Sequence, residues 1–166
     1  MASNQHREDA AGLHDLITGS STSEAWFNAG AAAGGPPQWQ RDVISRILAL
    51  TFDQEIEYLS TAMPDGEDWD IVAFTQSTVV RVLVVKNNEA VSHIESVAFP
   101  RSSLDSLELV EVAPIPTDGD AWPTQLGLIG HYRSATLVLP LDKFASSDNQ
   151  RDLTRLLTSL LQDLGH

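Results

Sequence analysis

The most regular pattern in this chain is Leu153-Thr-Arg-Leu-Leu-Thr-Ser-Leu-Leu-Gln-Asp-Leu164, close to the carboxyl end. Its six leucines recur at i, i+3, i+4, i+7, i+8 and i+11, so all of them lie on one stripe of an α-helix. Ser147 with Gln150 fits a capping box before this helix, and Gly165 fits its end. Burial of each leucine contributes roughly 1.5–3 kcal/mol. We therefore expect this helix to cover an apolar surface made by the rest of the chain.

The residues ahead of this helix favour β-structure. Turn-forming segments separate about seven predicted strands, which cover residues 52–60, Asp70–Thr75, Thr78–Lys86, Ala90–Phe99, Leu104–Ala113, Gln125–Ile129 and Ser134–Leu139. Residues 52–60 also fit a helix, and the β-rich sequence after them favours the strand. Apolar side chains on both faces of Thr78–Lys86 predict a strand that is central or covered on both sides. The alternation in Leu104–Ala113 slips near Glu111, which predicts a β-bulge.

The first 35 residues differ from the rest, because they combine a polar run with the small, flexible segment Gly30–Gly35. We therefore divide the chain into a leader, residues 1–35, and a domain, residues 36–166. The leader contains weak helical patches, one of them with Trp26 and Phe27. Two interpretations stay open: a mobile leader with transient helix, or an arm that docks these aromatic side chains on its own domain or on another chain. After Pro36-Pro37, apolar residues at helical spacing predict a helix over residues 37–50.

These elements predict an α+β protein with one helix, seven short antiparallel strands and a long terminal helix. Short strands separated by turns are typical of a strongly bent sheet or a small barrel. A small barrel has an open end, and the leucine-faced helix suits that opening. We therefore expect a seven-stranded antiparallel bent sheet or small barrel, capped by the C-terminal helix and preceded by an extra N-terminal helix.

The composition limits the classes of partner. The chain has 166 residues, 23 acidic against 10 basic side chains, a formal net charge of −13 and no cysteine. This charge repels phosphate backbones and anionic headgroups, so nucleic acid and membrane surfaces are not expected partners. The absence of cysteine excludes disulfides and thiolate metal sites. With no secretory signal and no apolar run long enough to span a membrane, we expect a cytoplasmic protein.

No motif in the sequence points to catalysis or to a cofactor. The acidic segment Asp65–Asp70 and the pair Asp118 and Asp120 could supply oxygen ligands for calcium, but they lack EF-hand spacing and are interpreted as solvated turns. His93 and Glu95 share a strand face, and we interpret them as solvated side chains rather than as a base and its partner. The sequence therefore predicts no catalytic, cofactor-binding or metal-binding residue, and a protein that is not an enzyme.

Three segments carry the order of these elements: Asp70-Ile-Val-Ala-Phe-Thr-Gln-Ser-Thr-Val-Val-Arg-Val82, Val97-Ala-Phe-Pro-Arg-Ser-Ser-Leu104, and the helix Leu153–Leu164. They resemble bacterial pleckstrin-homology-like (PH-like) domains. The resemblance covers residues 52–164 and implies seven antiparallel strands closed by one C-terminal helix. Lipid-binding members grip phosphoinositides with Lys and Arg in the loop after the first strand, whereas the matching loop here, Met63–Asp70, has four acids and no base. The resemblance thus implies a protein-interaction module that does not bind phosphoinositide.

We therefore expect a non-enzymatic module that binds a protein partner or a second copy of itself as a homo-oligomer. The candidate interface residues come from the leader, the apolar strand, the long loop and the segment His131-Tyr132-Arg133. They are Trp26, Phe27, Arg81, Leu83, Trp122, His131 and Tyr132. The alternative is a helix-grip protein of the START or Bet v1 type, which would hold a small hydrophobic ligand between the sheet and the terminal helix. Direct packing of the terminal leucines on the sheet would leave no room for that ligand.

Overall fold

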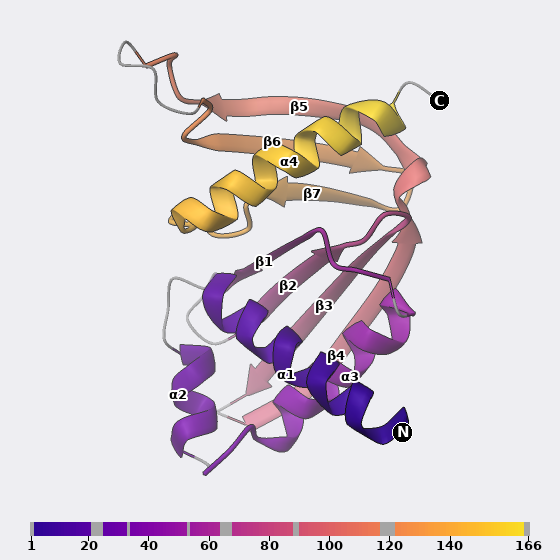
Figure 1. The fold of residues 1–166 in the computed structure, drawn as a ribbon, viewed down its shortest axis with the longest axis vertical. Helices are drawn as coiled ribbons and strands as arrows, with labels where there is room; N and C mark the ends of the chain where they lie inside the picture. Colours follow the sequence, from indigo (N-terminus) through magenta and orange to yellow (C-terminus); the bar gives the residue numbers. More distant parts are fainter. Residues whose placement is uncertain are drawn as a thin grey trace.

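The computed structural model describes residues 2–20, 25–32, 34–52, 54–63, 68–87, 90–116 and 122–164. The helices in these residues are α1 (Ala2–Ser20), α2 (Ala25–Ala32), α3 (Gln38–Thr51) and α4 (Ser147–Asp163), with a short 3₁₀-helix, η1 (Arg101–Ser103). The strands are β1 (Tyr58–Ala62), β2 (Trp69–Phe74), β3 (Thr78–Asn87), β4 (Ala90–Pro100), β5 (Leu104–Val112), β6 (Leu126–Tyr132) and β7 (Ala135–Leu139). Figure 1 shows α1, α2 and α3 beside one sheet and α4 beside a second.

The strands form two antiparallel sheets. β1, β2, β3 and β4 pair in chain order in a four-stranded sheet, sheet A, and β5, β6 and β7 do the same in a three-stranded sheet, sheet B. The predicted α+β class with antiparallel strands is confirmed, but a closed barrel is wrong. The sheets separate at the corner after β4, where Pro100 lacks an amide hydrogen and η1 turns the chain. β5 then pairs with β6 instead of extending sheet A.

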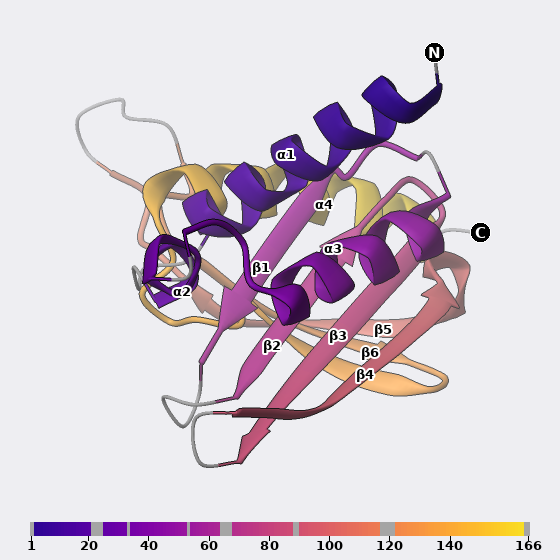
Figure 2. The ribbon, with the colours of Figure 1, turned by 90° about the horizontal axis from the view of Figure 1, so that it is seen from below.

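One face of sheet A is covered by helices, with α1 and α3 lying across it (Figure 2). The buried apolar residues of this first core are Leu13, Ile17, Trp26, Val43, Ile44, Ile47, Leu59, Trp69, Ile71, Ala73, Val80, Val82 and Val84. Leu13, Ile17 and Trp26, which belong to the predicted leader, are among them and pack with side chains of the predicted domain. Of the two interpretations of the leader, docking on its own domain fits this core.

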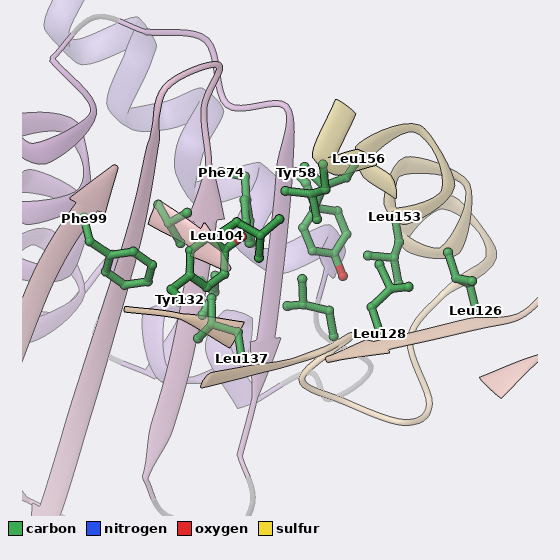
Figure 3. Packing of buried hydrophobic residues seen from close by; sticks show 14 residues of the cluster. Tyr58, Phe74, Phe99, Leu104, Leu126, Leu128, Tyr132, Leu137, Leu153 and Leu156 are labelled. Atoms are coloured by element: carbon green, nitrogen blue, oxygen red, sulfur yellow. The ribbon is translucent and has the colours of Figure 1, made fainter. Parts of the chain in front are cut away.

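The other face of sheet A shares a second core with sheet B and α4 (Figure 3). The buried residues of this core are Tyr58, Val72, Phe74, Val79, Phe99, Leu104, Leu126, Leu128, Tyr132, Leu137, Leu139, Leu153, Leu156 and Leu160. Leu153, Leu156 and Leu160 pack directly among strand side chains, in the space that the helix-grip interpretation assigns to a ligand. Leu161 and Leu164 are exposed, so only part of the predicted leucine stripe is buried.

Two predicted boundaries shift in the structure. Ser146, rather than Ser147, caps α4: its Oγ accepts a hydrogen bond from the amide of Asn149 at 3.2 Å. The side-chain oxygen of Gln150 does not take part in the cap. It accepts a hydrogen bond from the backbone amide of Leu126 at 2.8 Å. Residues 52–60 are a strand only from Tyr58 onward. Helix α3 ends at Thr51, and the left-handed backbone of Phe52 (φ 49°) stops both a helix and a strand there.

The chain has two tyrosines, Tyr58 and Tyr132, and both lie in the second core. The hydroxyl of Tyr58 donates to Oδ1 of Asn149 at 3.0 Å, whereas the buried hydroxyl of Tyr132 has no hydrogen-bond partner among the described residues. Burial is the main cause that raises the pKa of both phenols above the usual range. Both side chains should therefore stay protonated for as long as the fold persists.

Stability is expected to fall as the pH rises above about 10, where tyrosine ionises in the unfolded chain. Above this pH the folded chain holds more protons than the unfolded chain, so the free energy of unfolding decreases as the pH rises. In an alkaline titration, tyrosinate absorbance should appear together with the loss of circular dichroism. The variant Tyr132→Phe should halve the absorbance change without loss of stability at neutral pH, since it removes an unpaired buried hydroxyl. Tyrosinate formed by a chain with intact circular dichroism would contradict this expectation.

Candidate functional site

β5 is an edge strand of sheet B with one side unpaired. Its ladder with β6 ends with Val112 opposite Leu126, and the register shifts between Leu109 and Glu111. This shift confirms the bulge predicted from the slip near Glu111. Among the described residues, no strand pairs with the other side of β5. The backbone groups on that side face outward, as they do in strands that pair with another chain.

Large apolar side chains are exposed along β5 and in the loop after it. They are Leu109, Val110, Val112, Ile115 and Trp122, and we call these five residues the β5 surface. The indole nitrogen of Trp122 donates to the carbonyl oxygen of Ala113 at 2.7 Å, which holds the ring at the end of β5. Exposed apolar side chains gathered along one strand and its loop are typical of interaction sites.

The bulge gives β5 apolar side chains on both of its faces. Leu109 lies opposite Leu128, on the face that α4 partly covers, and still leaves 58% of its surface exposed. Val110 packs against β6 on the other face, where a Cβ on Gly127 would lie only 3.2 Å from Cγ2 of Val110 and 3.1 Å from Cβ of Glu111. The missing side chain of Gly127 thus lets the bulge approach β6 closely.

The three acidic residues of β5 each have a polar partner within sheet B or its loops. The carboxylates of Asp105, Glu108 and Glu111 lie 3.8 Å from Arg133, 3.0 Å from His131 and 2.7 Å from the amide of Gln125, respectively. These pairs are solvent-exposed, so each adds little to stability. Of the three partners, only the guanidinium of Arg133 brings a fixed positive charge to β5.

The predicted interface residues do not form one surface. Trp26 and Tyr132 are buried in the first and second cores, which corrects their assignment as interface residues. Trp26 is buried because its ring fills the space between Trp39 and Trp69, at centroid distances of 5.1 and 5.3 Å. Phe27, the next residue along α2, is exposed. Trp122 and His131 both lie at sheet B, and Trp122 belongs to the β5 surface.

The two candidates on β3 lie on the side of sheet A that faces away from α1 and α3. β3 pairs with β2 on one side and β4 on the other, so the predicted central position is confirmed. Arg81 donates from Nε and Nη2 to the two carboxylate oxygens of Asp70, at 3.0 and 2.7 Å. This hydrogen-bonded pair raises the pKa of Arg81. Leu83 is half-buried opposite Asp70. Arg81 is therefore committed to a contact within its own chain.

No group of His, Cys, Asp and Glu side chains in the described residues could hold a metal ion. Asp68 accepts the Lys86 amide at 2.8 Å. Asp70 lies in β2 and is paired with Arg81. The other acids of the two predicted acidic turns fall in residues 64–67 and 117–121, outside the described ranges. His93 lies 3.2 Å from Glu95, and both side chains are largely exposed. Within the described helices, none is long and apolar enough to cross a membrane.

Comparison with known proteins gives no relative: no family model, no curated protein and no solved structure matches this chain. Any function has to be inferred from its own residues.

Sequence reasoning missed most of the β5 surface, since only Trp122 was a predicted interface residue. A signal was present in Leu107-Glu-Leu-Val-Glu-Val112. The bulge in this segment puts apolar and acidic residues on both faces of the strand, whereas a strand with one buried face shows clean alternation. This mixed pattern is typical of an edge strand whose two faces both meet solvent.

Proposed function

We propose that this protein is a non-enzymatic, PH-like interaction module that associates with a second copy of itself through the β5 surface. The observation that carries this proposal is the unpaired edge of β5 with apolar side chains exposed on both faces. The order of antiparallel strands followed by a terminal helix supports the PH-like class. The net charge of −13 supports a protein partner over phosphoinositide, nucleic acid or an anionic membrane.

Pairing of two β5 strands about a two-fold axis would join two copies of sheet B into one continuous antiparallel sheet. A register centred on Leu109 places this leucine opposite its own copy and places Glu108 opposite Val110. In the same register Asp105 lies opposite Ala113, so no carboxylate of β5 faces another. Opposite-strand apolar pairs stabilise a sheet and like charges destabilise it, which favours this register.

Self-association of this kind is expected to strengthen with salt. Each chain carries a net charge of −13, so the two copies repel one another at low ionic strength. Physiological salt screens this repulsion beyond a distance of about 8 Å. The apolar contacts of the β5 surface are not weakened by that screening.

Val110→Lys is expected to abolish the association, because a lysine on an edge strand opposes pairing with another strand. Analytical ultracentrifugation at high protein concentration should give twice the monomer mass of 18.1 kDa for the natural sequence and the monomer mass for the variant. Val97→Lys is the matched control. Val97 is 49% exposed, against 53% for Val110, and lies on β4, one of the two edge strands of sheet A. This variant should keep the dimer.

A natural chain that stays monomeric at every concentration and salt would overturn self-association. Equal loss of the dimer in both lysine variants would place the contact outside β5 and contradict the proposal. If the natural chain is monomeric but binds a different protein, and if Val110→Lys blocks that binding while Val97→Lys does not, the partner of the β5 surface is that protein and not a second copy of the chain.

A further inference from the structure

A pocket lies between α1 and α3, on the helix-covered side of sheet A and away from the β5 surface. Its volume is about 410 Å³, within the range of sites that bind small molecules. It is lined by Ala10, Ala11, His14, Asp15, Pro36, Arg41, Ile44 and Ser45. Four of the eight residues carry polar or charged groups, but most of the lining surface is carbon, as in small-molecule sites generally. Figure 2 shows the two helices that form its walls.

His14 lines this pocket. Its Nε2 atom is buried and has no hydrogen-bond partner among the described residues. Its Nδ1 atom lies 3.7 Å from the carboxylate of Asp15, whose side chain is exposed. The ring also packs near Trp26, with centroids 6.2 Å apart, so its position is constrained. A buried polar atom without a partner is costly in a native protein and calls for an explanation, such as a ligand that pairs with it.

Arg41 brings a positive charge that no carboxylate neutralises among the described contacts. Its Nη1 donates to the carbonyl oxygen of Pro36 at 2.8 Å, and its Nη2 donates to the side-chain oxygen of Gln38 at 2.6 Å. Both acceptors are neutral, and they hold the guanidinium in place. Guanidinium groups make their strongest hydrogen bonds to carboxylates and phosphates, and this one retains unused N–H donors.

We propose that this pocket binds a small monocarboxylate with an apolar body. The carboxylate would accept hydrogen bonds from Arg41 and from an N–H of the His14 ring. The hydrocarbon part would lie against Ala10, Ala11 and Ile44. Asp15 and the net charge of −13 select against ligands with more than one negative charge. This site is independent of self-association through β5.

The test uses octanoate as the probe and octanol as a neutral ligand of the same length. Titration calorimetry on the full chain should show octanoate binding and little heat with octanol. Arg41→Gln is expected to weaken octanoate binding by about tenfold or more, since it removes a charge-assisted hydrogen bond. Arg46→Gln is the matched control: Arg46 lies on the same helix, is exposed, and bonds to Ser96 instead of lining the pocket. It should bind octanoate within about twofold of the natural chain.

A second measurement follows the ring nitrogens of His14 by nuclear magnetic resonance. Octanoate should shift the Nε2 resonance of His14 more than that of the exposed His93. Equal binding of octanoate and octanol would overturn the carboxylate assignment, and binding of neither would overturn the site. If octanoate binding weakens equally in the Arg41 and Arg46 variants, the cause is the loss of one positive charge anywhere on the helix. That result would contradict a specific contact with Arg41. The same titration in Val110→Lys should be unchanged, which separates this site from the proposed dimer.

Discussion

Arg101→Met is expected to lower the free energy of unfolding by about 3–5 kcal/mol, the usual cost of removing one partner from a buried ion pair. Arg101 is 1% exposed, although it lies in η1 at the corner between sheet A and sheet B. Methionine fills a similar volume, so the loss comes from the polar groups left behind. Urea denaturation followed by circular dichroism measures it.

The cost is large because Arg101 satisfies acceptors from three parts of the chain. Its Nη1 donates to Oε2 of Glu57 at 2.7 Å and to the carbonyl oxygen of Thr75 at 2.8 Å. Its Nε and Nη2 donate to Asp163 and Ser159 of α4, at 3.0 and 2.6 Å. Both carboxylates are partly shielded from water and would lose their partner together. The substitution thus loosens the attachment of α4 to sheet A.

Arg81→Met is the matched control for this experiment, since it also removes one arginine from a hydrogen-bonded pair. Arg81 is more exposed, and we expect a loss of about 1 kcal/mol. A further variant, Arg101→Met with Glu57→Gln and Asp163→Asn, should recover part of the Arg101 loss, because it removes the two unpaired charges. A loss in Arg101→Met no larger than in Arg81→Met would show that the buried network adds little to stability.

Arg101 could not be identified from the sequence. Pro100-Arg-Ser-Ser103 indicates a break between two strands, and an arginine in such a break is most simply a solvated side chain. Its two acidic partners lie 44 and 62 residues away along the chain. No local pattern links residues at that separation. The burial of Arg101 follows from the three-dimensional arrangement, which brings the corner at η1, the end of β2 and α4 together.

Local patterns predicted the elements better than their assembly. The leucine spacing predicted α4, and the valine-rich run predicted the central strand β3, because both depend on periodicity within one segment. The division into two sheets depends on which strand follows the corner at η1, and alternation does not encode that choice. The free edge of β5 is a consequence of the same division. In a closed barrel β5 would have a neighbouring strand on each side. Because a barrel was expected from the sequence, most of the candidate site on the free edge of β5 was missed.

Trp26→Ala is expected to lower the free energy of unfolding by about 3–5 kcal/mol, as large aromatic-to-alanine changes in a core do. Trp26 is fully buried against Trp39 and Trp69, and its backbone oxygen accepts a hydrogen bond from the Gln40 side chain at 2.7 Å. The neighbouring variant Phe27→Ala is the control. Phe27 is 55% exposed, and its loss should change stability by less than about 0.5 kcal/mol.

The same pair of variants decides whether the first 35 residues fold with the rest of the chain. Marginal domains have about 5–15 kcal/mol of stability, so the Trp26 loss would be a large fraction of the total. If α1 and α2 belong to one cooperative unit, tryptophan fluorescence and circular dichroism should report a single coincident transition at lower urea in Trp26→Ala. An early fluorescence change, followed by unfolding of the sheets at the urea concentration of the natural chain, would contradict one unit. It would instead identify α1 and α2 as an arm that docks on an independently stable pair of sheets.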